Sequence, residues 1–221
     1  MFKFIETHPF SIAAAIFSVI IIGGLVEVWP AFTQNTRPME GLKPYSALEL
    51  AGRQIYIREG CNNCHSQLIR PFKNETDRYG AYSKSGEYAY DRPFLWGSRR
   101  IGPDLFRVGA VRTTDWHEAH FRDAQSTSPG SVMPNFTWFF EDNTDIDTAY
   151  AELITLKQVF NLPYDSEGMP KTGTYDEVKK AMLDEAALIT ADMKSADIKT
   201  SLEQGNIKEV VAMIAYLNRL K

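Results

Sequence analysis

Residues 61–65 read Cys-Asn-Asn-Cys-His and directly follow a glycine at position 60. The chain has 221 residues but two cysteines, and both lie in this short stretch. Two thiols one helical turn apart can bond to the two vinyl groups on one edge of a haem, and the adjacent histidine can ligate the iron. Because this is the spacing of c-type haem attachment, we expect Cys61 and Cys64 to hold one covalent haem c and His65 to bind its iron.

Other chemistries of a cysteine pair fit less well. Two cysteines are too few for a multi-disulfide scaffold or a four-cysteine zinc site. A thioredoxin-like thiol–disulfide oxidoreductase needs a βαβ setting, and no strand of useful length is predicted. A Cys₂His₂ zinc site would need His117 and His120, and the gap of 53 residues from Cys64 to His117 exceeds that of a compact finger.

The N-terminal part of the chain predicts a membrane anchor over residues 1–32. Residues 9–26 carry no charge, and these 18 residues would span roughly 27 Å as a helix, close to the hydrocarbon thickness of a bilayer. A cleaved signal peptide is the alternative, but no A-x-A site follows the apolar run. Basic residues lie on both sides of the helix, Lys3 before it and Arg37 after it, so charge gives no orientation.

The rest of the chain reads as helices and irregular segments. Residues 33–45 contain two prolines and a glycine and predict a linker, and a capping box of Ser46 and Glu49 opens the next helix. Apolar periodicity predicts helices over 47–59, about 114–124, 145–160, 174–189 and 206–220, with a long aromatic loop over 66–98.

The predicted fold class is therefore mainly α. One N-terminal transmembrane helix precedes a class I-like cytochrome c domain over 46–221, with a long aromatic loop insert and an extra helical insertion over 141–205. The formal net charge is −4 and no basic tract appears, so a nucleic-acid partner is not expected. With 44% hydrophobic residues, wholesale disorder is excluded.

The second axial ligand of the iron has several candidates. Met182 and Met213 lie in amphipathic helices and are better explained as core residues. Met133 and Met169 are each followed by proline, which stiffens an irregular loop. Met133 has apolar and aromatic neighbours that can exclude water, whereas Met169 lies between charged residues as in a surface turn. His120 allows bis-histidine ligation, but an aromatic-flanked helical histidine is more often packed, so we predict Met133.

Two further segments are candidate haem contacts. Pro103 lies in Gly-Pro-Asp-Leu at 102–105, which matches a segment that many c-type cytochromes place beside the iron-binding histidine. A backbone carbonyl there would accept a hydrogen bond from His65 and fix its tautomer. Arg99 and Arg100 can pair with haem propionates, although two solvated arginines are an equally good interpretation.

Together, three segments and the anchor resemble the monohaem subunit II of bacterial cbb3-type cytochrome c oxidase. The segments are GCNNCHSQLIRPF at 60–72, YDRPFLWGSRRIGPDL at 90–105 and SVMPNF at 131–136. The likeness runs from the anchor to about residue 138, and the C-terminal helices carry no signature of their own.

The resemblance implies an electron relay at the bacterial inner (cytoplasmic) membrane, single-pass in lipid, with its haem domain in the periplasm. Electrons would come from a dihaem cytochrome c subunit or a soluble cytochrome c. They would pass to a b-type haem of the catalytic haem-copper subunit, which reduces oxygen to water and pumps protons. The resemblance also implies that residues 96–100 face that subunit and that a cation binds near Ser98. The alternatives are the haem c subunit of a nitric oxide reductase and a free-standing membrane-anchored cytochrome c.

Overall fold

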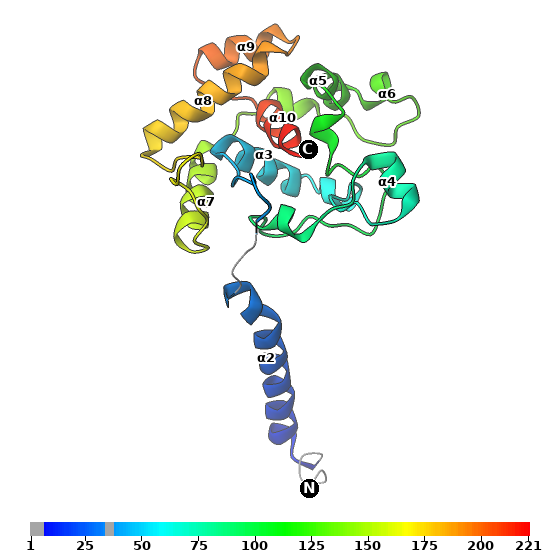
Figure 1. Ribbon diagram of the computed structural model, residues 1–221, viewed down its shortest axis with the longest axis vertical. Coiled ribbons are helices and arrows are strands. Elements are labelled where there is room, and N and C mark those ends of the chain that lie inside the picture. The colour runs from blue at the N-terminus through cyan, green and yellow to red at the C-terminus, as the bar shows by residue number, and fades with distance from the viewer. Residues whose placement is uncertain (1–6, 34–37) are drawn as a thin grey trace. The chain divides into compact units, whose positions relative to one another are not determined.

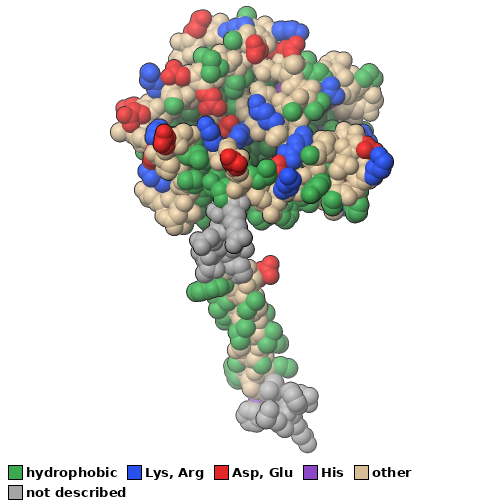
Figure 2. All heavy atoms as spheres, in the orientation of Figure 1, with side chains coloured by type: hydrophobic (Ala, Val, Ile, Leu, Met, Phe, Trp, Pro, Cys, Tyr) green, Lys and Arg blue, Asp and Glu red, His purple; other side chains and the backbone are tan. Residues whose placement is uncertain are grey.

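A run of uncharged residues forms the first helix, α2 (Pro9–Thr33). The computed structural model describes residues 7–33 and 38–221 and divides into two units, Met1–Arg37 and Pro38–Lys221. Within α2, residues 9–29 have a mean hydropathy of 2.3 and no buried side chain, so this helix is long and apolar enough to cross a bilayer. Figure 2 shows its surface covered by hydrophobic side chains. Residues 1–6 of the predicted anchor and 34–37 of the predicted linker lie outside the described residues.

The second unit is helical, as predicted (Figure 1). Among the described residues no strand forms, and the one β-bridge pairs Asn143 with Lys208. The helices in chain order are α3 (Ala47–Arg58), η1 (Cys61–Asn63), α4 (Lys73–Tyr79), η2 (Ser85–Tyr88), η3 (Val108–Ala110), α5 (Thr114–Arg122), α6 (Ala124–Thr127), η4 (Thr137–Phe140), α7 (Ile146–Gln158), α8 (Tyr175–Ala191), α9 (Ala196–Glu203) and α10 (Glu209–Arg219).

Helices α3 and α10 pack against each other at the centre of this unit (Figure 1). The predicted capping box starts α3: Ser46 Oγ accepts from the Glu49 amide, and Glu49 Oε2 accepts from the Ser46 amide at 2.8 Å. Their contact is close at Gly52, where an added Cβ would overlap the Ala212 carbonyl and lie 2.8 Å from Tyr216 Cβ. Glycine is therefore needed here for the approach of two backbones.

The segment predicted as an extra helical insertion packs onto this pair. Helices α7 and α8 contact α3, and α8 also contacts α10 and α9. The capping box of Thr174 and Glu177 starts α8 as the sequence predicts. Helix α9 was not predicted, because Ile198 is its one buried residue and gives no apolar stripe. Helix α10 begins at residue 209, later than expected, since the Ile207 carbonyl instead accepts from the Thr144 amide at 2.8 Å.

The segment predicted as an irregular loop over 66–98 contains two short helices, α4 and η2. Helix α4 was missed because its sequence is polar, and its buried side chain is a carboxylate, Glu75. That carboxylate pairs with Arg70 and lies 3.3 Å from Arg100 Nη2, and the Arg70 guanidinium lowers its pKa. A small apolar cluster of Ile69, Tyr88 and Phe106 supports the segment from within.

Candidate haem site

The Cys-Asn-Asn-Cys-His segment forms one tight turn after α3. Gly60 has φ of 67°, in the left-handed region that glycine adopts without steric cost. The turn is closed by the Cys61 carbonyl, which accepts from the amides of Cys64 at 3.2 Å and His65 at 2.9 Å. Both sulfurs and the imidazole are thus carried on a single turn, as attachment to one edge of a haem requires.

The surroundings of the cysteines argue against the other cysteine chemistries. Burial and then the carboxylate of Glu59 raise the pKa of Cys61 to about 12, whereas a redox-active cysteine needs a lowered pKa. Cys61, Cys64, His117 and His120 all belong to the part of the chain that the structure describes, and they form no metal-binding group of three or more there. The raised pKa of Cys61 is thus opposite in direction to that of a redox-active thiol.

Three buried tyrosine hydroxyls hold the residues that follow the turn. Tyr56 of α3 donates to the His65 carbonyl at 3.1 Å. Tyr88 donates to the Gln67 carbonyl at 2.7 Å, and Tyr216 of α10 donates to Gln67 Oε1 at 2.9 Å. Burial raises the pKa of each tyrosine, so all three remain protonated donors. These tyrosines thereby fix the position of residues 65–67. Sequence reasoning did not identify this role of the tyrosines.

His65 is held in the tautomer that can bind a metal. Its Nδ1 lies 2.8 Å from the Pro103 carbonyl oxygen. Because a carbonyl only accepts, Nδ1 carries the proton and Nε2 keeps its lone pair. Burial lowers the pKa of His65 and favours the neutral ring. Gly102 packs on this ring so closely that an added Cβ would lie 2.6 Å from Nδ1. The hydrogen bond expected from the 102–105 segment is therefore present.

A thioether and a second imidazole lie beside each other between α5 and the loop that follows α6. Met133 Sδ lies 3.1 Å from Nε2 of His120, which belongs to α5. The His120 ring stacks on Trp116 with centroids 4.5 Å apart, and its Nδ1 lies 2.6 Å from Thr127 Oγ1. Burial lowers the pKa of His120 and favours its neutral ring.

Residues 2–221 match the family described as cytochrome c oxidase, mono-heme subunit/FixO. The chain belongs to this family. No curated protein sequence matches the chain. Membership makes it a monohaem cytochrome c subunit of an oxidase complex, active in electron transport, with a catalytic subunit as its partner. One haem c and a membrane-anchored chain agree with this family, given two cysteines at 61 and 64 and one helix long enough to cross a bilayer.

The residues of this mono-heme subunit fit a covalent haem c. Cys61 and Cys64 supply the thiols, and His65 supplies a neutral imidazole with Nε2 available. Met133 would supply a soft, half-buried thioether sulfur. A haem bound here would supply an iron that changes by one electron.

The other methionines lie elsewhere. Met169 lines a hollow with Ser46 and Ala47 at the start of α3. This helix is about 18 Å long and Cys61 follows its other end, so Met169 lies at the opposite end of α3 from the cysteines. Met182 and Met213 are buried in the core as predicted, and Met193, which lies in a polar stretch of sequence, is buried there too. Of the two methionines that precede proline, Met133 is therefore the one whose sulfur lies beside a histidine, His120.

The two arginines of the mono-heme subunit differ in their surroundings. Arg99 is exposed, whereas Arg100 donates to the Leu68 carbonyl at 2.8 Å and pairs with Glu75. Arg100 Nη1 also lies 3.2 Å from the Gly97 carbonyl and 3.4 Å from that of Ser98. Arg100 is thus engaged within the protein, and its positive charge leaves the cation expected near Ser98 without structural support.

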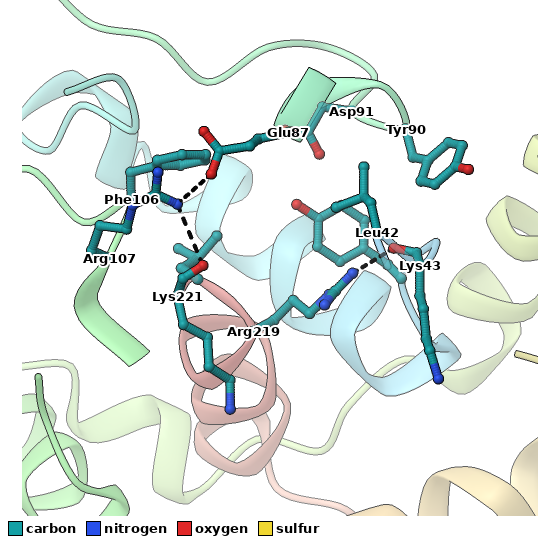
Figure 3. Close-up of a pocket in the computed structure, with 11 residues that line it drawn as sticks. Leu42, Lys43, Glu87, Tyr90, Asp91, Phe106, Arg107, Arg219 and Lys221 are labelled. Carbon is teal, nitrogen blue, oxygen red and sulfur yellow. Dashed lines mark hydrogen bonds and ion pairs between the residues drawn. The ribbon is translucent and has the colours of Figure 1, made fainter. Parts of the chain in front are cut away.

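A cavity of about 80 Å³ lies among Tyr45, Asp91 and the C-terminal residues (Figure 3). Its two arginines have partners within the protein. Arg107 pairs with Glu87 at 2.6 Å, and Arg219 donates to the Lys43 carbonyl at 2.5 Å. His65, His120 and Met133 do not line it. This cavity therefore lies at the contact between the C-terminus and the 38–107 region, and the candidate haem ligands do not line it.

We predict that Gly102→Ala disturbs the haem site without unfolding the chain. The new methyl group would overlap the His65 ring, turn it and lengthen its bond to Pro103. Loss of such a supporting contact typically costs about 10- to 100-fold in activity. Electron transfer through the chain would be measured by stopped-flow spectroscopy. Ile101→Ala, at an exposed neighbouring position, is the control and should leave haem ligation unchanged.

Proposed function

We propose that this subunit is the single-electron relay of a cbb3-type oxidase, with Cys61 and Cys64 attaching the haem and His65 and Met133 binding its iron. The observation that carries the proposal is the single turn that holds Cys61, Cys64 and His65, with His65 Nδ1 fixed at 2.8 Å on the Pro103 carbonyl. Met133 is proposed as the second ligand, and its Sδ lies 3.1 Å from His120 Nε2. A histidine–methionine pair favours a high reduction potential. The iron would then have no vacant position for oxygen, so this chain carries electrons while its partner reduces oxygen.

The proposed route follows from the site and from the family. Electrons would arrive from a dihaem cytochrome c subunit or a soluble cytochrome c, and leave for the b-type haem of the catalytic subunit. That subunit would reduce oxygen to water and pump protons. We place the haem domain in the periplasm, since c-type haems are attached on the outer side of the bacterial cytoplasmic membrane.

An exposed aromatic pair supports a docking surface on residues 94–100. The rings of Phe94 and Trp96 stack with centroids 4.4 Å apart, and their side chains are 48% and 46% exposed. The buried Tyr88 ring packs edge-on against both rings and supports the pair. Rigid exposed aromatics are enriched at protein interfaces. We propose that this surface contacts the catalytic subunit.

Capture of the full-length chain from membranes in mild detergent tests the proposal. The reduced-minus-oxidised visible spectrum of the captured material should contain b-type bands besides the c-type band, and the sample should consume oxygen. A c-type band alone, in a preparation shown to be intact, would favour a free-standing carrier. Captured b-type haem with nitric oxide consumption and no oxygen consumption would instead favour a nitric oxide reductase.

A further inference from the structure

The imidazole of His120 is held by three neighbours. Nδ1 lies 2.6 Å from Thr127 Oγ1, and Nε2 lies 3.1 Å from Met133 Sδ. The ring also stacks on Trp116, with 16° between the ring planes. The stack fixes the plane of the imidazole, so each of its two nitrogens faces one partner.

The two polar contacts define which nitrogen of His120 carries the proton. A thioether sulfur only accepts, and a nitrogen without a proton at 3.1 Å would set its lone pair against those of the sulfur. Nε2 therefore carries the proton and donates to Met133 Sδ. Nδ1 of the neutral ring then accepts from the Thr127 hydroxyl at 2.6 Å. The same hydroxyl lies 3.3 Å from the Ala124 carbonyl, which is the longer and weaker of its two contacts.

His65 has the opposite tautomer. Its Nδ1–H donates to the Pro103 carbonyl and leaves a lone pair on Nε2, as a metal ligand requires. His120 instead presents a proton from Nε2 and offers no lone pair there. The geometry of His120 therefore gives no support to the bis-histidine ligation that the sequence leaves open, and points to a role as donor.

The loop that carries Met133 is tied to the same part of the chain as the histidine. The Phe136 amide donates to the Phe121 carbonyl at 2.8 Å, at the end of α5. The Ala124 amide, at the start of α6, donates to Asn135 Oδ1 at 3.2 Å. The N–H···S bond thus joins two segments whose backbones are already held together, so little further ordering is needed to form it.

We propose that His120 is a positioning residue for the thioether ligand: its Nε2–H holds one lone pair of Met133 Sδ and leaves the other lone pair for the iron. The inference rests on the proposed function, because it takes Met133 as the second ligand. Thr127 supports this role, since its hydroxyl occupies Nδ1 and keeps the proton on Nε2.

The hydrogen bond has two consequences for the ligand. A methionine side chain has three rotatable bonds, and the bond to His120 holds its sulfur in one place. The bond also draws electron density from the sulfur, which makes the thioether a weaker donor to ferric iron. Hydrogen bonding around an axial ligand is one of the means by which a protein sets a haem potential, and here its direction is to raise the reduction potential.

The test compares His120→Leu with His120→Gln in the full-length, haem-loaded chain in mild detergent. Leucine fills the space but donates no hydrogen bond, whereas the side-chain amide of glutamine is a donor. Redox titration should show a reduction potential about 30 mV lower in His120→Leu, which for one electron is about a threefold change in the ratio of ferrous to ferric iron. His120→Gln should recover most of this loss, which a purely structural role of the ring would not predict.

A second pair of variants tests the proton on Nε2. Thr127→Val keeps the shape of the side chain but removes the hydroxyl that donates to Nδ1, and Thr127→Ser keeps the hydroxyl as the matched control. Thr127→Val should lower the potential in the same direction as His120→Leu, and Thr127→Ser should not. Nitrogen-15 resonance of the ferrous, histidine-labelled chain should place the His120 proton on Nε2, with the signal assigned by its loss in His120→Gln.

Two results would overturn the inference while leaving the proposed function intact. One is an unchanged potential in His120→Leu, in a chain whose sulfur-to-iron charge-transfer band disappears with Met133→Ala. The other is a proton on Nδ1 of His120 in the wild-type chain. If His120→Leu fails to fold, the Thr127 pair decides, and equal potentials in its two variants would overturn the inference. A Met133→Ala variant that keeps the wild-type ligation would refute the proposed ligand itself, and the inference with it.

Discussion

Replacing both cysteines with serine should remove the covalent haem and, with it, all electron transfer through this chain. Serine hydroxyls do not add to the haem vinyl groups as thiols do, and Cys61 and Cys64 are the two cysteines of the sequence. The Cys61→Ser/Cys64→Ser variant should show no haem-bound band after denaturing electrophoresis. Oxygen consumption of the captured complex should fall to the level measured without this chain.

Asn62→Ser is the matched control for this prediction. Residue 62 occupies a position of the turn at which attachment requires no particular side chain, so the variant should keep its haem. Alkylation of the unfolded wild-type chain completes the test. Two thioether bonds leave no thiol to label, whereas two labelled thiols would show that the cysteines serve another chemistry.

The features that sequence reasoning located are local ones. Both capping boxes, at Ser46 and Thr174, begin their helices as predicted, because the hydrogen bonds join residues three positions apart. The haem-attachment motif is equally local, since the hydrogen bonds that close its turn lie within Cys61–His65. A short polar helix has no such local signal, and α4 was therefore missed.

The supports of the site depend on contacts that are distant in the sequence. Tyr216 and Gln67 are 149 positions apart, and their hydrogen bond forms only after α10 has packed against α3. The contact of His120 with Met133 also joins separate segments: α5 ends at Arg122, and α6 begins at Ala124, where the predicted helix over about 114–124 should have ended. Asp123 caps α6 by accepting from the Gln125 amide at 3.1 Å. Sequence reasoning identified neither this cap nor the break.

The contact between α3 and α10 gives the second large expected effect, that of Gly52→Ala. On an isolated helix this change would stabilise by about 1 kcal/mol, because alanine has the higher helix propensity. Here the new Cβ would overlap the Ala212 carbonyl, a backbone atom that moves only if the whole of α10 shifts. Overpacking of this kind costs about 1–3 kcal/mol or more. We expect a net loss of about 2 kcal/mol for alanine and a larger loss for valine.

Urea unfolding followed by far-ultraviolet circular dichroism would measure this loss of unfolding free energy. The control is Ile57→Ala, at an exposed position on the same helix. It should cost less than about 1 kcal/mol. A gain in stability for Gly52→Ala would contradict the packing of the two helices.

The same variant also connects the fold to function. Tyr56 of α3 and Tyr216 of α10 donate to residues 65 and 67, so separation of the helices would release the backbone that carries His65. The haem potential should therefore shift in Gly52→Ala and stay unchanged in Ile57→Ala, because the helix pair that forms the core also positions the axial histidine.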